Sequence, residues 1–521
     1  MKLEPRDVSE GSFLVEFPDS SESEANRLAV GLAARLTRVH RRGLLDAIPG
    51  ARTLFILFEP RLGARASFVA LIGRLVREVG TATPESRRFR IPVAYGGENG
   101  PDLADLARVR GMAPEELARR HAAADYTVAF LGFSPGFPYL TGLPSALAAP
   151  RLDRPRPRVA AGSVAIGGPY TAIYPEETPG GWNLIGRSSV RLFDASANPP
   201  ALLRAGDHVS FDAIGEDELR ALRAESAARA AVGEISPSGD PLLEIAAPGL
   251  FTTVQGAPRF GLGASGVSAG GAMDPVALAC GNAMVGNPPE AAALEMTLSG
   301  PEVVFRRDAL VGISGADLPA RWNGTPAPEG EPFQVRSGDR LGFGYASRGA
   351  RAYLCVAGGL RPGRPGEPSR RLAKGDVVFR ESDGENPTRR TDLPETLPGR
   401  EVTVSVLSGP QQSDFPAEAS AILFAASWKI SAESDRRGIR LEGPSLPLRR
   451  APDIPPEGTA LGGIQVPANG QPIVLGPDRP VTGGYAKIGT VVSLDWPLLA
   501  QAVPGATVRF RAAAFSDSGR G

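Results

Sequence analysis

Two glycine loops have the composition of an anion-binding corner. Each pairs two glycines with an aromatic residue, and the residues are Gly180, Gly181 and Trp182 in the first loop and Gly483, Gly484 and Tyr485 in the second. Successive backbone N–H groups in a glycine turn can converge on an anion, because no side chain blocks its approach. The alternative is a tight barrel corner with the aromatic ring packed beneath it.

The second loop also gathers side chains that could hold a carboxylate or a phosphoryl group. They are Asp478, Arg479, Thr482 and Lys487. Lysine is scarce in this chain, since only Lys2, Lys374, Lys429 and Lys487 occur. A lysine within a motif is therefore informative. We favour anion binding for the second loop and packing for the first.

Three arginines lie in other segments that could bind an acidic substrate. Arg436 and Arg440 belong to the run from Ser434 to Arg440, whose guanidinium groups could pair bidentately with a carboxylate. Arg156 lies among prolines shortly before Ser163 and could act in the same way. For both segments, a solvated run of charges is an equal alternative.

Two carboxylates could transfer a proton. Asp274 precedes Pro275, so we expect it first to cap a helix ending near Gly286 and only second to act in catalysis. Glu295 lies in the apolar run ALEMTL, where a carboxylate is either paired or functional. His121 is expected at a helix end, as a partner of the helix dipole.

Common nucleotide and nucleophile signatures are weak or missing. Gly261 to Gly266 matches GxGxxG, but no βαβ unit surrounds it and the next helix starts only at Pro275, so we reject a Rossmann site. There is no GxxxxGK[ST] motif, and no Ser, His and Asp arrangement suggests a triad. A nucleotide would need an unusual site.

The first ninety residues predict an α+β unit. The expected elements, in chain order, are a strand at 12–17, a helix carrying Leu28, Leu32 and Leu36, strands at 45–48 and 53–58, a helix at 66–79 and a strand at 89–93. This βαββαβ order is typical of a ferredoxin-like fold.

An internal repeat predicts one type of β-barrel in both halves. Beyond residue 91, glycine and proline separate short alternating strands, which is typical of barrels or sandwiches. The two glycine loops share the pattern Gly-Gly-aromatic-x-x-Ile-Gly, and each is followed by a glycine turn into a strand that ends in Phe211 or Phe510. Duplication of a barrel explains this similarity.

The length of 521 residues is enough for three or four domains. We divide the chain into residues 1–90 (ferredoxin-like), 91–232 (barrel), a linker at 233–241, and 242–521, subdivided near 400. The fold class is thus mainly β with an α+β part.

The composition excludes several classes of function. Basic and acidic residues balance at 57 each, so no overall positive field exists to bind nucleic acid or an anionic membrane. Cys280 and Cys355 are the only cysteines and the three histidines lie far apart, which argues against disulfides and metal sites. No apolar run reaches membrane-spanning length and no signal peptide is visible, so we expect a cytoplasmic protein.

Longer motifs resemble a known pair of families. IPVAYGGENGPDL (91–103), LGFSPGFPYLTGLP (131–144) and IYPEETPGGWNLIGR (173–187) resemble the B component of bacterial 5-oxoprolinase, also described as the kinase inhibitor KipI or allophanate hydrolase subunit 1. LEMTLSGP (294–301), SDRRGIRLEG (434–443) and IQVPANGQPIVLGPDRPVTGGYAKIG (464–489) resemble the C component, the KipA or carboxyltransferase type. The chain therefore resembles a fusion of B and C.

The resemblance implies a ferredoxin-like piece, cyclophilin-like barrels and an ATP-dependent 5-oxoprolinase that acts with a separate A component on a small amide. ATP would be shared with that partner, and a homo-oligomer is possible. We assign Glu295, Asp274 and Lys487 to catalysis. Substrate binding is assigned to the loop and arginine residues named above together with Gln465.

Two other functions stay open. A biotin-dependent carboxyltransferase acting on urea or a similar amide is one, although this chain has no internal Met-Lys site for covalent biotin. A non-enzymatic inhibitor of a sensor histidine kinase is the other.

Overall fold

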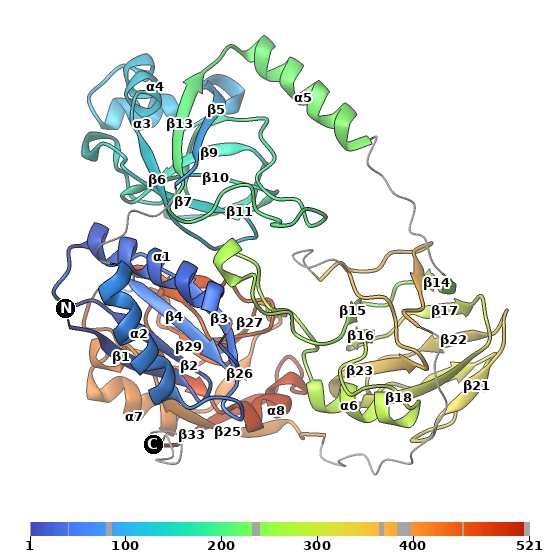
Figure 1. The fold of residues 1–521 in the computed structure, drawn as a ribbon. Coiled ribbons are helices and arrows are strands. Elements are labelled where there is room, and N and C mark those ends of the chain that lie inside the picture. The colour runs from blue at the N-terminus through green and yellow to red at the C-terminus, as the bar shows by residue number, and fades with distance from the viewer. Residues whose placement is uncertain are drawn as a thin grey trace.

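The computed structural model describes residues 2–39, 41–79, 86–231, 240–363, 369–382, 397–450 and 453–514. The chain forms three bodies, as Figure 1 shows. A barrel lies at the top left, a second barrel lies behind the N-terminal unit at the lower left, and a β-sandwich lies at the right. Most of the predicted linker, residues 233–241, lies outside the described residues. The helix α5 (Glu216–Ala231) leads to it.

The N-terminal unit is an antiparallel sheet covered by two helices. Its strand order is β1 (Glu4–Ser9), β2 (Ser12–Glu16), β4 (Thr53–Phe58) and β3 (Leu44–Pro49). Helices α1 (Glu22–Val39) and α2 (Arg65–Val79) bury apolar stripes at helical spacing, including Leu28, Leu32 and Leu36. The prediction that the strand at 89–93 closes this sheet is wrong. That strand belongs to the first barrel, and β1 occupies an edge of the sheet instead.

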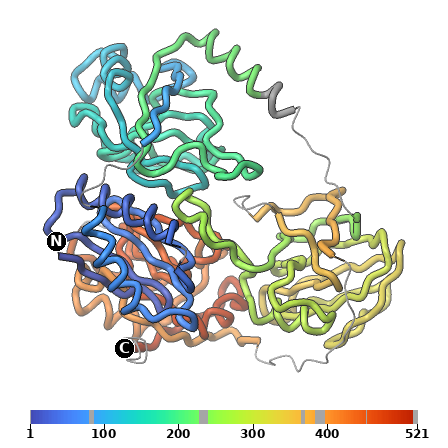
Figure 2. Tube along the Cα trace, in the orientation of Figure 1, coloured from blue at the N-terminus to red at the C-terminus, as the bar shows by residue number. Residues whose placement is uncertain are grey.

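The other face of this sheet packs on the second barrel. Val8, Leu14, Ile48 and Phe55 form one buried cluster with Ala460 and Val481. A Cβ at Gly458 would lie only 2.2 Å from the Cβ of Phe55, so only glycine permits this approach. The first eighty residues therefore dock onto the last part of the chain, and the blue and orange segments lie together in Figures 1 and 2.

The first barrel is closed by seven strands. They are β5 (Arg88–Tyr95), β6 (Tyr126–Leu131), β7 (Pro138–Thr141), β9 (Ser163–Gly167), β10 (Tyr170–Ile173), β12 (Asn183–Arg187) and β13 (His208–Ala213), in the order β10-β7-β6-β13-β5-β12-β9. Helices α3 (Leu103–Val109) and α4 (Pro114–Ala122) follow β5. A separate ribbon pairs β8 (Arg156–Val159) with β11 (Thr178–Gly180).

The second barrel repeats this topology strand for strand. Its strands are β25 (Glu401–Ser408), β26 (Trp428–Ile430), β27 (Gly438–Glu442), β29 (Gly463–Gln465), β30 (Ile473–Leu475), β32 (Lys487–Val491) and β33 (Thr507–Ala512). The order β30-β27-β26-β33-β25-β32-β29 matches the first barrel, and β28 (Asp453–Gly458) with β31 (Thr482–Tyr485) forms the equivalent ribbon. The sequence repeat is thus confirmed as a duplicated barrel.

The region between the barrels is a sandwich of two open sheets. One sheet contains β14 (Pro241–Ala247), β17 (Glu302–Phe305), β19 (Ala320–Trp322), β20 (Thr325–Pro326), β22 (Arg340–Phe343) and β24 (Val377–Phe379). The other contains β15 (Phe251–Gln255), β16 (Ala293–Thr297), β18 (Ala309–Asp317), β21 (Phe333–Val335) and β23 (Arg348–Val356). Helix α6 (Pro275–Met284) packs against β18 and β23. Helices α7 (Ala417–Ala425) and α8 (Trp496–Ala500) belong to the second barrel.

None of the described helices combines the length and the apolar character needed to cross a bilayer.

Candidate functional site

A loop from the sandwich, residues 256–272, joins the three bodies. In Figure 2 it runs from the sandwich to the junction of the first barrel and the N-terminal unit. Asp46 on β3 accepts hydrogen bonds from the backbone N–H groups of Gly261 and Gly263 at 3.0 and 3.2 Å. Gly136 N–H of the first barrel donates to the carbonyl of Ser265. The GxGxxG segment is therefore an interdomain contact, in line with rejection of a Rossmann site.

Beside this loop lies a cleft of about 430 Å³ whose walls come from both barrels and the sandwich. The first barrel contributes the loop after β6 and Glu176. The second barrel contributes the equivalent loop after β26 and residues 478–480. Six arginines line the cleft, namely Arg259, Arg361, Arg370, Arg436, Arg437 and Arg479. The lining also includes three carboxylates, Glu176, Asp435 and Asp478, so its arginines outnumber its acidic residues and the cleft suits an anionic ligand.

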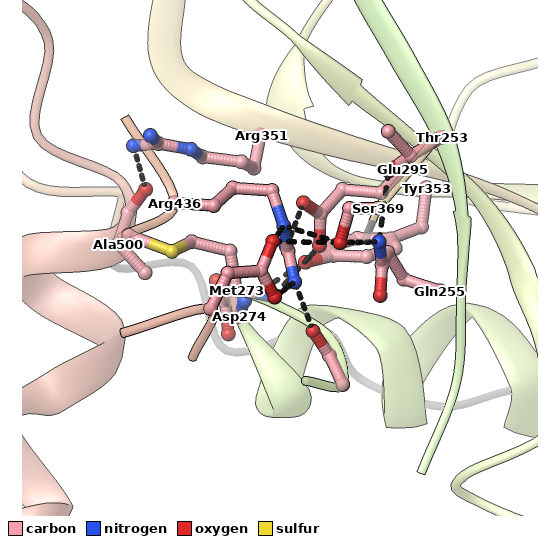
Figure 3. Close-up of polar contacts among 12 residues, drawn as sticks. Thr253, Gln255, Met273, Asp274, Glu295, Arg351, Tyr353, Ser369, Arg436 and Ala500 are labelled. Atoms are coloured by element: carbon pink, nitrogen blue, oxygen red, sulfur yellow. Dashed lines mark hydrogen bonds and ion pairs between the residues drawn. The ribbon is translucent and has the colours of Figure 1, made fainter. Parts of the chain in front are cut away.

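Arg436 organises one wall of the cleft. Its guanidinium group lies 2.5 Å from Oε1 of Glu295 and donates to both carboxylate oxygens of Asp478, at 2.8 and 3.1 Å. It also donates to the Gly271 carbonyl at 2.6 Å and to Ser369 Oγ at 3.2 Å. Figure 3 shows Arg436 beside Glu295 and Ser369 at the contact between barrel and sandwich. Burial alone lowers the pKa of Arg436, but Glu295 and Asp478 outweigh it, and the net pKa is raised.

Glu295 lies on β16 and is 1 % exposed. Besides Arg436, it accepts hydrogen bonds from the Met273 backbone N–H at 2.7 Å and from the Tyr353 hydroxyl at 2.8 Å. Burial and the adjacent Glu295 raise the pKa of Tyr353 well above its usual value, so the phenol keeps its proton. Glu295 is paired, which was one of the two expected alternatives.

Asp274 caps α6, as predicted. Its Oδ1 accepts the N–H groups of Val276 and Ala277 at 3.1 and 3.0 Å, while Oδ2 accepts Nε2 of Gln501 at 2.7 Å. Burial raises the pKa of Asp274, and these hydrogen bonds, which lower it, do not offset the effect of burial. Gln501 follows α8 of the second barrel, so this carboxylate joins the sandwich to that barrel.

Arg479 lies in the cleft wall and is half-buried. It donates to the carbonyls of Thr459 at 3.2 Å and Gly476 at 3.4 Å. Burial lowers the pKa of Arg479 to about 10, and Asp46 and Asp478 act in the opposite direction. The group therefore stays charged near neutral pH.

Lys487, the lysine of the second glycine loop, does not line this cleft. It is fully buried on β32, and its Nζ lies 2.6 Å from Oε1 of Glu457, with no other polar partner among the described residues. Gln411 donates to the same Glu457 oxygen at 2.7 Å. Gln465 on β29 pairs with Lys487 on the neighbouring strand β32, and its Nε2 is close to the position that a Cβ on Gly483 would take.

The other residues of this loop lie on the ribbon strand β31. They are Thr482, Gly483, Gly484 and Tyr485. Thr482 is buried against Gly132 of the first barrel, where any added side chain would collide with it. The loop therefore helps to join the two barrels. Anion binding by its backbone stays a prediction.

The first glycine loop packs in an aromatic cluster, as favoured for it. Trp182 is 5 % exposed and lies edge-on to Phe137 and Tyr139, with Gly180 against Tyr174. Gly181 follows the ribbon strand, and a Cβ added to it would lie 3.6 Å from the Leu152 carbonyl oxygen.

Three further predicted binding residues have other surroundings. Arg156 pairs with Asp102 at 2.6 Å, Ser163 is buried at the start of β9, and Arg440 is exposed on β27. The cleft lining does not include them.

The structure corrects the role predicted for His121. It is fully buried within hydrogen-bond distance of the Tyr95 and Thr171 hydroxyls, at 2.8 and 2.9 Å, and burial lowers its pKa to about 3. His121 lies in the last turn of α4, so its predicted place at a helix end is confirmed. A neutral imidazole is not a charged partner of the helix dipole, so the predicted dipole role is wrong.

Sequence reasoning missed several residues of these networks, namely Asp46, Gln255, Tyr353, Ser369, Gln411 and Glu457. Gln255 donates to Ser369 at 2.8 Å, and Ser369 donates to Asp478 at 2.7 Å. Asp46 is a carboxylate within the apolar segment LLDAIP of β3, and the same signal marked Glu295 and could have found Asp46. Glu457 follows two prolines on β28, in the segment DIPPEG, and lacks that signal.

Two duplicated barrels meeting at an arginine-lined cleft define a bipartite carboxyltransferase-type protein. The family described as "Carboxyltransferase domain, subdomain C and D" matches residues 3–203, and "Carboxyltransferase domain, subdomain A and B" matches residues 265–512. The chain belongs to this family and joins in one polypeptide the counterparts of the B and C components of 5-oxoprolinase.

Relatives match each half separately. The N-terminal half is 36 % identical over 231 residues to the B component of 5-oxoprolinase from Bacillus subtilis, which covers 42 % of this chain and 96 % of that protein. The C-terminal half is 33 % identical over 282 residues to the C component of 5-oxoprolinase from Escherichia coli, covering 52 % of this chain and 90 % of that protein. Urea amidolyase of Lachancea kluyveri is 30 % identical over 51 % of this chain but only 17 % of its own length.

A solved structure matches the whole arrangement. The crystal structure of TTHA0988 covers 96 % of this chain and 99 % of its own, with 34 % identity and a TM-score of 0.81.

Proposed function

We propose that this chain is the fused B and C component of an ATP-dependent 5-oxoprolinase, which converts 5-oxoproline to L-glutamate together with a separate A component. The observation that carries the proposal is that one polypeptide covers nearly the full length of relatives named as each of the two components. The cleft between the two halves supplies a place where both would act on one ligand.

The chemistry of the cleft suits this reaction. 5-Oxoproline carries a carboxylate, and activation by ATP adds a phosphoryl group, so the site must hold several negative charges. Planar guanidinium groups pair bidentately with both anions, and six arginines outnumber three carboxylates in the lining here. Arg437 and Arg479 would contact the anion. Bound ATP would supply the phosphoryl group that activates the amide.

Arg436 acts as the fixed centre of this wall. Glu295 and Asp478 hold its guanidinium plane, and Gly271 fixes it from the loop that joins the bodies. In this proposal Glu295 and Asp274 help to position the residues of this wall. Proton transfer by either carboxylate is a second role that we propose for them. Lys487 would act only indirectly, through Glu457.

The direct test is glutamate formation. The purified chain mixed with the A component, ATP and 5-oxoproline should release glutamate. Arg437→Ala should lower kcat/KM at least tenfold, since a charged hydrogen bond is worth about 1.5–3 kcal/mol. Arg440→Ala is the matched control, because Arg440 is an exposed arginine three residues away that does not line the cleft. No glutamate from the unaltered chain rejects the proposal.

A carboxyltransferase acting on urea or a similar amide is the second candidate. The family description and the urea amidolyase relative favour it. Biotin would have to be carried by another chain. Copurification of a biotinylated protein, detected on a streptavidin blot, together with carboxylation of urea and no glutamate formation, would establish this function in place of the first.

A further inference from the structure

Ser134 in the first barrel has an unusual environment for a buried hydroxyl. The residue is 5 % exposed, and its Oγ has no hydrogen-bond partner among the described residues. It lines the cleft that the arginines of the other half also line. Buried polar groups are almost always hydrogen-bonded, so an unpaired hydroxyl at a cleft points to a partner supplied by a ligand.

The backbone around Ser134 is held from several sides. Its N–H donates to the Gly132 carbonyl at 2.8 Å, and its carbonyl accepts from Phe137 N–H at 3.0 Å. Gly266 of the joining loop packs so closely that an added Cβ would lie 2.9 Å from the Ser134 carbonyl oxygen. These contacts hold the main chain in place. The side-chain hydroxyl is the group that has no hydrogen-bond partner among the described residues.

The preceding residue adopts a strained conformation. Phe133 has φ of 69°, in the left-handed region that bulky side chains rarely occupy, and its ring lies edge-on to Phe137 and Tyr174. Phe133 also lines the cleft. Such strain persists where the surroundings enforce it and concentrates at ligand sites. The aromatic cluster of the first barrel thus sets the direction of the Ser134 segment.

We infer that Ser134 Oγ is a ligand-binding group contributed by the B-type half, donating a hydrogen bond to a phosphoryl or carboxylate oxygen of a ligand held by the arginines of the C-type half. The inference deepens the proposed function and rests on it only for the identity of the substrate. The ligand class itself, a small molecule with phosphoryl or carboxylate groups, follows from the cleft.

The test uses the full chain and inorganic pyrophosphate as the probe, measured by calorimetry. Ser134→Ala should weaken binding about tenfold or more, as expected for loss of a hydrogen bond to a charged group. Ser134→Thr keeps the hydroxyl and should retain most of the affinity. Ser210→Ala, a serine on β13 outside the cleft, is the matched control and should bind as the unaltered chain does.

Thermal unfolding separates a ligand role from a structural one. Since the hydroxyl has no partner among the residues that the structure describes, Ser134→Ala should unfold at the same temperature as the unaltered chain or higher. Unchanged pyrophosphate affinity in Ser134→Ala, or equal weakening in Ser210→Ala, overturns the inference. In the presence of the A component, Ser134→Ala should raise KM for 5-oxoproline. Absence of turnover in the unaltered chain with intact pyrophosphate binding would reject the proposed function alone.

Discussion

The two barrels share a topology but differ in how they fill the same corner. In the first barrel, Ala165 pairs with Leu184 beside the aromatic cluster of Trp182. At the matching place in the second barrel, Gln465 pairs with Lys487. Apolar packing therefore fills one corner and a buried ion pair the other. The two barrels thus share a backbone topology, while the side chains at this corner make different interactions.

The ribbon residues show the same divergence. Gly180 lies opposite Arg156 and Gly483 lies opposite Glu457. Asp102 accepts the Leu184 N–H at 2.6 Å and pairs with Arg156, whereas Gln411 accepts the Lys487 N–H at 3.2 Å and donates to Glu457. The cation is on the ribbon in one barrel and on the barrel strand in the other. The two barrels therefore share a fold but not the position of the charged side chains at this corner.

The largest effect is expected at Arg436, which ties the second barrel to the sandwich. Arg436→Gln leaves Glu295 buried without its cation, and we expect a loss of about 3–5 kcal/mol in the free energy of unfolding. Urea unfolding measures it. Arg437→Gln, an exposed neighbour, should change stability by less than about 0.5 kcal/mol. Equal midpoints for all three proteins would contradict the importance of this network.

The next effect concerns the buried pair of the second barrel. Among the described residues, Lys487→Met leaves Glu457 with Gln411 as its one side-chain hydrogen-bond partner, and stability should fall by about 3 kcal/mol. The double variant Lys487→Met with Glu457→Gln removes both charges and should recover most of this loss. A double variant no more stable than the single one would show that packing, and not charge, governs the corner.

Asp46, which binds the loop of residues 256–272, should make the free energy of unfolding depend on pH. Burial raises the pKa of Asp46 to about 6, against hydrogen bonds from Gly261 and Gly263. Between about pH 4 and 6 the folded chain keeps a proton that the unfolded chain releases, so the free energy of unfolding falls as pH rises, by up to about 3 kcal/mol. Denaturant unfolding across this range measures it. Asp46→Asn should flatten this part of the profile, and an unchanged slope would rule out Asp46 as its source.

The smallest effect is expected at the first barrel's ribbon pair. Arg156 and Asp102 are partly exposed, with 31 % and 17 % of their side chains accessible, so water screens the pair. Arg156→Ala should cost about 1 kcal/mol or less in thermal or urea unfolding. A loss as large as that of Lys487→Met would mean that both corners depend equally on charge.

Much of the fold could be predicted from local sequence. The helices of the N-terminal unit, the capping of α6 by Asp274 and the duplicated barrel all follow from periodicity, capping chemistry and an internal repeat, which act over short stretches of chain. The strand at 89–93 was assigned to the wrong sheet, because its pairing with β12 and β13 involves residues about a hundred positions away. Local patterns contain no information on such partners.

The candidate site divides in the same way. The sequence by itself determined which segments were unusual: the arginines near residue 436, the carboxylate of Glu295 in an apolar strand and the two glycine loops. Only the tertiary structure decided that Arg436 pairs with Glu295, that Lys487 is buried beside Glu457, and that Ser134 shares a cleft with arginines from the other half. The physical reason is that charge and burial depend on neighbours brought together by packing, and those neighbours come from distant parts of the chain.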